Sequence, residues 1–308
     1  MTLDPSYLEY YKRAEGMDHD LYPWSNLFAR KPIAWPNGAK LLTWIVIDLE
    51  WFPITPNDKP FRAPGHMQTA YPDYRHYTSR DYGNRVGIYR LLDALEKVGA
   101  KASIATNSAI AERYPSLASD IISAGHEIVA HATDMNAAIA TGVPENEERE
   151  MIAASLDGIA KITGVRPTGW LSLARSQSFN TPALLAEAGL TYMCDWVNDD
   201  LPYPMTTKQG SILNLPLNHE LSDRQILNVQ QQSMASYCEQ MQDAFAWLAG
   251  EAETNGGRML PLNITPYIMG LPYRMAEFEG LLRWLAAQPA HGFATGAEIA
   301  AAASSQLD

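Results

Sequence analysis

Short apolar segments of strand length alternate about seven times with longer segments of helical periodicity along most of this 308-residue chain. The first apolar segment, residues 41–48, is almost continuously apolar, which is typical of a strand buried on both faces. Residues 88–98 have apolar side chains three and four positions apart, which predicts a helix. The alternation therefore predicts an α/β fold: an irregular (β/α) barrel of about seven parallel strands with outer helices.

The expected elements follow from the same patterns. Strands are predicted at residues 41–48, 102–107, 127–130, 169–172, 190–195, 212–217 and 259–264, with a short one at 292–295. Helices are predicted at residues 88–98, 116–124, 144–163, 181–188, 233–254, 274–287 and 296–303. Prolines punctuate residues 53–77, which predicts a long loop of the kind that is usually functional or contacts a partner.

The chain divides into an arm and one large body. Residues 1–38 are rich in Tyr, Trp and Pro without clear periodicity, so we expect an N-terminal extended arm that packs on the body. The length alone would allow two domains. Because no repeat, low-complexity tract or linker interrupts the rest, we expect residues 39–308 to form a single (β/α) barrel domain.

Composition excludes several classes of partner. The net charge is −12 with the acidic residues scattered, whereas a nucleic-acid partner would call for a basic stripe. No apolar run approaches the roughly 20 residues that span a membrane, and the N-terminus lacks the pattern of a signal peptide. The two cysteines, Cys194 and Cys238, are too few for a disulfide framework, which suits a reducing compartment. We therefore expect a cytoplasmic protein that binds neither nucleic acid nor membrane.

Polar side chains follow nearly every predicted strand. The carboxyl ends of parallel strands meet at one edge of a sheet, where α/β proteins usually carry their chemistry. Because buried charges must be paired, such a set is hard to explain as packing and favours an active site. For His131 alone, a structural cap that bonds a backbone carbonyl is the competing interpretation. The set comprises Asp48, Glu50, Asn107, His131, Trp170, Ser172, Asp195, Glu220 and Thr265.

Several familiar catalytic motifs do not occur in the sequence. There is no G-x-G-x-x-G after a strand and no phosphate-binding loop of the Walker type, so nucleotide binding has no support. There is also no G-x-S-x-G elbow, which argues against a serine hydrolase of the α/β-hydrolase type. A carboxylate or histidine that takes a proton from water, with a second acid that protonates the leaving group, is the chemistry that remains.

Six blocks of the sequence resemble, in collinear order, the polysaccharide deacetylase superfamily, and most closely its branch of metal-independent allantoinases and cyclic imide hydrolases. The blocks are residues 80–87, 125–131, 166–170, 180–189, 195–203 and 266–270. The resemblance covers about residues 35–303. It implies an irregular (β/α) barrel, hydrolysis of an amide or imide C–N bond, and a homo-oligomer in which the N-terminal arm contributes to the contact.

The sequence departs from the pattern of that superfamily at three places, two of which concern its metal-dependent members. They use adjacent acids after the first strand and a second histidine four residues after the first, whereas this chain has Asp48-Leu-Glu50 and Met135. Met is a poor ligand for a hard or borderline divalent ion. We therefore expect no tightly bound metal and no cofactor, and leave a weakly bound divalent metal open. The histidine expected on the late strand is replaced by Thr265, and His219, His66 and His76 are candidate substitutes.

The resemblance and the strand-end pattern together assign roles to the candidate residues. The catalytic set is Asp48, Glu50, His131 and Asp195: one of the first two would act with His131 to activate water, and Asp195 would hold a neighbouring cation or donor. Arg80, Arg85 or a backbone N–H would stabilise the oxyanion. The competing interpretations are an ion pair of Arg85 with Asp81 and a core position for Trp170. The substrate-binding set is Arg80, Tyr82, Arg85, Asn107, Trp170, Ser172, Glu220, Thr265 and Tyr267.

The expected function is hydrolysis of a non-peptide C–N bond in a small cyclic amide, imide or ureide. Two alternatives remain open. One is a metal-dependent deacetylase of an N-acetylated sugar or small amide, and the other is a non-catalytic small-molecule binding protein on the same scaffold.

Overall fold

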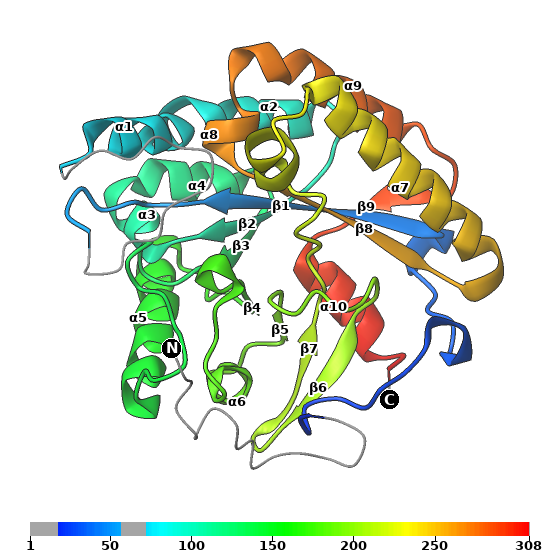
Figure 1. The fold of residues 1–308 in the computed structure, drawn as a ribbon, viewed down its shortest axis with the longest axis horizontal. Coiled ribbons are helices and arrows are strands. Elements are labelled where there is room, and N and C mark those ends of the chain that lie inside the picture. Colours follow the sequence, from blue (N-terminus) through cyan, green and yellow to red (C-terminus); the bar gives the residue numbers. More distant parts are fainter. Residues whose placement is uncertain (1–17, 57–71, 308) are drawn as a thin grey trace.

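A computed structural model of the chain describes residues 18–56 and 72–307. The described residues contain nine strands in one curled sheet (Figure 1): β1 (Leu41–Leu49), β2 (Ser103–Thr106), β3 (Glu127–Ala130), β4 (Gly169–Trp170), β5 (Tyr192–Met193), β6 (Tyr203–Thr207), β7 (Gly210–Asn214), β8 (Arg258–Ile264) and β9 (His291–Phe293). Their order is β6-β7-β5-β4-β3-β2-β1-β8, with β9 beside β1. All neighbouring pairs are parallel except β6 and β7. The prediction of an irregular α/β barrel with parallel strands is confirmed.

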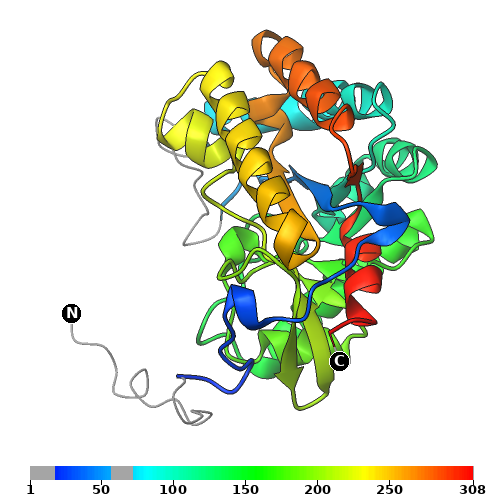
Figure 2. The same cartoon turned by 90° about the vertical axis from the view of Figure 1, so that its right-hand side faces the viewer.

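Most helices cover the outer side of this sheet, whereas α10 packs against the cluster on its inner side (Figures 1 and 2). The α-helices of the described residues are α1 (Tyr74–Tyr82), α2 (Ile88–Glu96), α3 (Ser108–Arg113), α4 (Pro115–Ser123), α5 (Glu145–Thr163), α6 (Thr181–Glu187), α7 (Met234–Asn255), α8 (Pro266–Met269), α9 (Pro272–Ala286) and α10 (Gly296–Ser304). Two π-helical turns add to them, η4 (Gly83–Gly87) and η6 (Arg224–Val229). No helix within the described ranges combines the length and apolar character needed to cross a membrane.

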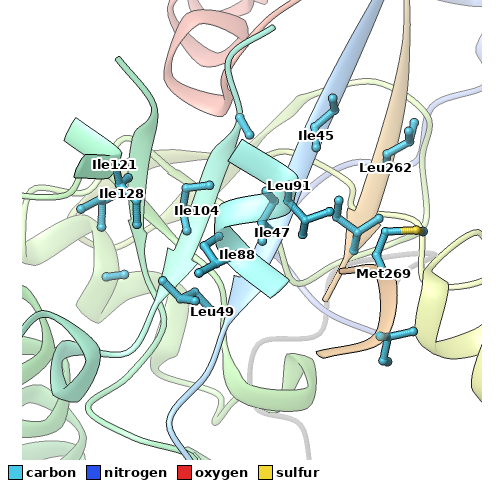
Figure 3. Packing of buried hydrophobic residues seen from close by; sticks show 14 of the residues in the cluster. Ile45, Ile47, Leu49, Ile88, Leu91, Ile104, Ile121, Ile128, Leu262 and Met269 are labelled. Atoms are coloured by element: carbon cyan, nitrogen blue, oxygen red, sulfur yellow. The ribbon is translucent and has the colours of Figure 1, made fainter. Parts of the chain in front are cut away.

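Strand β1 shows why the sequence forms two cores. Side chains alternate between the faces of a strand, so Ile45, Ile47 and Leu49 pack in the cluster between the sheet and its helices (Figure 3). The other face of β1 carries Trp44 and Val46 into a second buried cluster inside the curl. Both faces are buried, as the continuous apolar run predicts.

Several elements differ from the expectation, among them β6 and α8, which were not predicted. Helix α1 begins inside the expected long loop of residues 53–77. The sequence did not predict it because its residues are polar and lack apolar periodicity. Asp73 caps it by accepting a hydrogen bond from the backbone N–H of His76. Helix α3 was not expected either. The predicted strand at residues 212–217 begins earlier, at Gly210, and pairs antiparallel with β6 across a short turn.

The described part of the N-terminal arm runs along the body, next to β6 and the end of the chain (Figures 1 and 2). The backbone N–H of Thr206 donates to the carbonyl of Leu21 at 2.7 Å. The indole N–H of Trp35 donates to the carbonyl of Arg258 at 2.8 Å. Residues 1–17 of the arm lie outside the described residues, and so does His66.

Candidate active site

Two carboxylates emerge from β1 on its inner face. Asp48 continues the inward row of Trp44 and Val46, and Glu50 lies two residues further on, so the strand period directs both acids into the curl. Both are almost completely buried, with exposures of 7% and 4%. From β8, Asn263 donates to Oδ1 of Asp48 at 2.9 Å. The sequence spacing Asp-Leu-Glu therefore has a structural purpose: it places two acids side by side.

Arg224, the first residue of η6, lies between these acids. Its Nη2 is 2.7 Å from Oε1 of Glu50 and 3.6 Å from Oδ2 of Asp48. Its Nη1 donates to the hydroxyl of Tyr267 at 3.0 Å, and that hydroxyl donates to Oε2 of Glu50 at 3.3 Å. A π-helical turn is uncommon and is frequent at functional sites. The guanidinium thus supplies the positive charge that two buried carboxylates require.

His131 completes this buried cluster from the end of β3. Its Nδ1–H donates to the carbonyl of Leu171 at 2.6 Å, which fixes the ring, because a carbonyl can only accept. Its Nε2 lies 3.8 Å from Oε1 of Glu50 and makes no hydrogen bond with any residue that the structure describes. Burial lowers the pKa of His131, but the carboxylates of Glu50 and Asp48 outweigh burial and raise it overall. The ring is both capped, as the competing interpretation expected, and placed against an acid.

The surroundings shift the pKa values of the two acids in opposite directions. Burial raises the pKa of Asp48 more than Arg224 and Asn263 lower it, so the pKa is raised. Burial also acts on Glu50, but Arg224 and His131 outweigh it and hold the pKa of Glu50 at about 2. One acid of the pair is therefore firmly ionised, and the other accepts a proton more readily than an ordinary aspartate.

These groups line a pocket of about 490 Å³. Its other polar lining residues are Ser172, Arg175, His219, Glu220 and Asn263. A hollow of similar volume, about 460 Å³, lies between the arm and residues 198–204, but it contains none of the buried acids or His131. The chemistry-bearing groups therefore converge on the first pocket, whose size suits a small molecule.

Tyr267 is held in place by close helix packing. Gly83 and Gly87 of η4 lie against α8, and a Cβ at Gly87 would be only 2.1 Å from the carbonyl oxygen of Pro266. Asn84 of the same turn donates to the carbonyl of Glu50 at 3.1 Å. The block of residues 80–87 thus fixes Tyr267 and the backbone of Glu50 from behind.

The predicted site residues separate into those that line the pocket and those that support it. The pocket is lined by Asp48, Glu50, His131, Ser172 and Glu220. Tyr267 does not line the pocket itself, but its hydroxyl donates to Glu50, which does. The supporting residues are Asp195, Asn107, Trp170 and Thr265, which are buried behind the lining.

Each supporting residue has a definite contact. Asp195 accepts a hydrogen bond from the backbone N–H of Ser172 at 2.7 Å. Asn107 donates to the carbonyl of His131. The indole of Trp170, a core residue as its competing interpretation expected, donates to Oγ of Ser172 at 2.8 Å. Thr265 donates its N–H to Asp223 at 2.7 Å.

The three residues of the 80–87 block do not line the pocket. Arg80 is buried, with its guanidinium 5.1 Å from the ring centre of Phe52 and 5.2 Å from that of Tyr267. The hydroxyl of Tyr82 accepts a hydrogen bond from Arg90 at 2.5 Å. The side chain of Arg85 is 73% exposed and lies 3.8 Å from Asp81, as its competing interpretation expected.

The sequence did not predict three polar residues of the pocket, Arg175, Arg224 and Asn263, and indicated His219 only as a substitute for the missing histidine. Asn263 could have been found, because it lies two residues before Thr265 on the same inward face of a predicted strand. Arg224 does not directly follow a predicted strand and has no periodic neighbours, so the sequence carried no signal for it.

The residues present do not fit a divalent metal. Among the described residues, no three His, Cys, Asp or Glu side chains are grouped to hold an ion. The space between the two acids is bordered by the guanidinium of Arg224, 2.7 Å from Glu50, and one oxygen of Asp48 is occupied by Asn263. A second cation there would be repelled by Arg224.

Comparisons with known proteins agree with this architecture. The family model "Polysaccharide deacetylase" matches residues 75–193. The structure of PuuE allantoinase has a TM-score of 0.82 at 24% identity, covering 92% of this chain and 98% of the other. Two structures provisionally named as polysaccharide deacetylases come from Pseudomonas aeruginosa PAO1 and Mycobacterium smegmatis. They have TM-scores of 0.81 and 0.77, each at 23% identity; they cover 92% and 94% of this chain, and 99% and 97% of their own.

No curated protein sequence matches the chain. The family match and the shared fold nevertheless agree with the resemblance expected from the six sequence blocks. Residues 75–193 thus match the polysaccharide deacetylase family model, and the chain shares its fold with PuuE allantoinase and with a protein named as a probable polysaccharide deacetylase.

Proposed function

We propose that this chain is a hydrolase that opens a C–N bond of a small cyclic amide, imide or ureide without a tightly bound metal. The observation that carries the proposal is the buried pair of Asp48 and Glu50, whose pKa values are pushed in opposite directions within one pocket. Such divergence is how proteins assign different acid and base roles to neighbouring carboxyl groups.

The geometry supports the following division of roles. Asp48, with its raised pKa, takes a proton from water as the water oxygen attacks the substrate carbonyl carbon. Glu50 stays ionised and, through its charge, keeps His131 protonated. His131 then donates its Nε2 proton to the leaving nitrogen as the C–N bond breaks, and the proton held by Asp48 restores the imidazolium. The net reaction adds one water and yields a ring-opened carboxylic acid.

The test is kinetic. Asp48→Asn, Glu50→Gln and His131→Ala are assayed against a panel of cyclic imides and ureides with a chelator present. Each change should lower kcat at least about 100-fold, because general acid–base groups typically contribute that much. Asp157→Asn is the matched control, since this acid is exposed and paired with Arg166 at the surface. If the activity survives all three changes, the proposed groups do not perform the reaction.

Two other outcomes would identify the alternatives. Activity that chelator abolishes and zinc restores would indicate a metal-dependent deacetylase. Thr265, at the place where the resemblance to the superfamily implies a histidine, favours a binding protein as the second candidate. For that protein, ligands should raise the melting temperature without product formation, because a ligand that binds only the folded state stabilises it.

We also propose that the protein is cytoplasmic and forms a homo-oligomer through its arm. The arm exposes two large aromatic side chains, Trp24 at 73% and Phe28 at 78%. Light scattering of the purified protein checks the mass, and Trp24→Ala with Phe28→Ala should shift it to the monomer if the arm makes the contact.

A further inference from the structure

The pocket contains a second arginine, Arg175. Its charge is not paired with a carboxylate, whereas that of Arg224 is paired with Glu50 and Asp48. Nη2 of Arg175 donates to the carbonyl of Leu217 at 3.1 Å, and Nη1 lies 3.4 Å from Nδ1 of His219. Among the described residues it forms no ion pair, and its buried Nε has no hydrogen-bond partner. Such a buried donor costs free energy unless a ligand satisfies it.

The backbone that presents Arg175 is strained. Ala174 and Arg175 have φ values of 51° and 55°, in the left-handed region that non-glycine residues rarely adopt. Strain of this kind persists only where the surroundings impose it, and it is found at ligand-binding sites. Two consecutive residues in this conformation, one of them carrying an unbalanced cation into a pocket, point to a ligand group.

Asp195 accounts for how the strained turn is held. One oxygen accepts from the backbone N–H of Ser172 at 2.7 Å, and the other accepts from the side chain of Gln177 at 2.5 Å. These contacts bracket the turn η5 (Leu173–Arg175) on both sides. Asp195 does not line the pocket; it fixes the loop from which Arg175 reaches it.

We propose that Arg175 binds the carboxylate that ring opening creates, and that Asp195 positions Arg175 for this contact. The inference rests on the proposed function: water adds to a neutral cyclic amide, imide or ureide, the C–N bond breaks, and one proton goes to the leaving nitrogen. The carboxylic acid formed at the attacked carbon then loses its proton to solvent and becomes a carboxylate. The ligand class is therefore a small open-chain amido- or ureido-carboxylate. A cation beside that carbon stabilises the developing charge more than the neutral ring, which accelerates the reaction.

The test measures binding, so it does not depend on turnover. The probes are two ring-opened products: succinamate, from an imide, and N-carbamoylglycine, from a ureide. Their uncharged amide analogues are succinamide and N-carbamoylglycinamide. By calorimetry at pH 7, the wild-type protein should bind at least one carboxylate about 10- to 100-fold more tightly than its amide, because hydrogen bonds between charged groups typically contribute that much.

Four variants test which residues cause the preference for the carboxylate. Arg175→Asn removes the charge and tolerates a left-handed backbone, so it should abolish the preference without unfolding the protein. Arg175→Lys should retain part of it. Arg166→Gln, a surface arginine paired with Asp157, should leave it unchanged. Asp195→Asn should weaken it while the charge of Arg175 remains, which a merely structural loss of stability would not do selectively.

The outcomes separate this inference from the proposed function. Equal binding of carboxylates and amides by the wild-type protein, or a preference that survives Arg175→Asn, overturns the role of Arg175 even if cyclic substrates are hydrolysed. A preference that disappears in Arg175→Asn supports the role even if none of the cyclic substrates is turned over, and only the proposed reaction would then fail.

Discussion

The ion pair between Glu50 and Arg224 should stabilise the folded protein far more than a surface pair of similar geometry. Glu50 has a pKa of about 2 instead of its usual 4.5. Since one pH unit corresponds to about 1.4 kcal/mol, the ionised carboxylate gains about 3 kcal/mol on folding. Both side chains are buried, with exposures of 3% and 11%, so solvent does not screen this interaction strongly.

A double-mutant cycle measures how much of this stabilisation comes from the contact between Glu50 and Arg224. Glu50→Gln, Arg224→Met and the double variant are unfolded with urea at pH 7, and the coupling free energy is taken from the three differences. We expect a coupling on the order of 3 kcal/mol, because burial raises the pKa of Glu50, Arg224 is the largest cause that lowers it, and His131 adds to the lowering. Arg224→Met alone should be the least stable, because it leaves two buried carboxylates without a counter-charge. The folded pKa lies below the unfolded one, so the stabilisation is present above about pH 4.5 and is lost as the pH falls towards 2.

The surface pair of Arg166 and Asp157 is the control for this cycle. Its atoms are 2.5 Å apart, but the side chains are 49% and 66% exposed. Exposed pairs typically contribute less than about 1 kcal/mol. If the buried cycle gave the same coupling as this exposed cycle, the assigned lowering of the Glu50 pKa by Arg224 would be wrong, and the proposed division of roles between the two acids would lose its basis.

Three further predictions concern the supporting structure. Gly87→Ala should cost about 1 to 3 kcal/mol in urea unfolding, because the added methyl group meets the carbonyl oxygen of Pro266, a backbone atom that cannot rotate away. Burial raises the pKa of Asp223 to about 7, although Thr265 donates a hydrogen bond to it. The folded protein therefore disfavours the ionised carboxylate, and its stability should fall as the pH rises from about 5 to about 8. The melting temperature of the wild-type protein should fall more over this range than that of Asp223→Asn. Tyr267→Phe should lower kcat/KM about tenfold without unfolding the protein, because it removes the hydroxyl that contacts both the carboxylate and the guanidinium.

The sequence predicted the part of the site that strand periodicity controls. The even-numbered residues of β1 face inward, so Asp48 and Glu50 had to emerge together once that strand was recognised. His131 follows β3 in the same way, because Val129 belongs to the inner cluster. For these residues, the alternation of side chains along a strand is enough to predict which face of the sheet they lie on.

Residues on irregular elements could not be predicted in this way. Arg80, Tyr82 and Arg85 lie in a block that resembles the superfamily, and their chemistry suggested substrate binding. In the structure this block is a helix and a π-helical turn, and its closest contacts come from two glycines that let η4 approach α8. The resemblance located an important segment, but the sequence could not distinguish packing from ligand contact.

The counter-charge of the acid pair shows most clearly why ligand patterns alone are an incomplete guide. Two buried carboxylates can share a proton, bind a metal or pair with a fixed cation. Asp48 and Glu50, at the end of β1, would be compatible with any of these three arrangements. What decides between them is Arg224, which lies more than 170 positions later on a turn without periodicity. Because that guanidinium lowers the pKa of Glu50 while burial raises that of Asp48, the chemistry of the pair is set by a residue that neither strand pattern nor metal-ligand spacing can reveal.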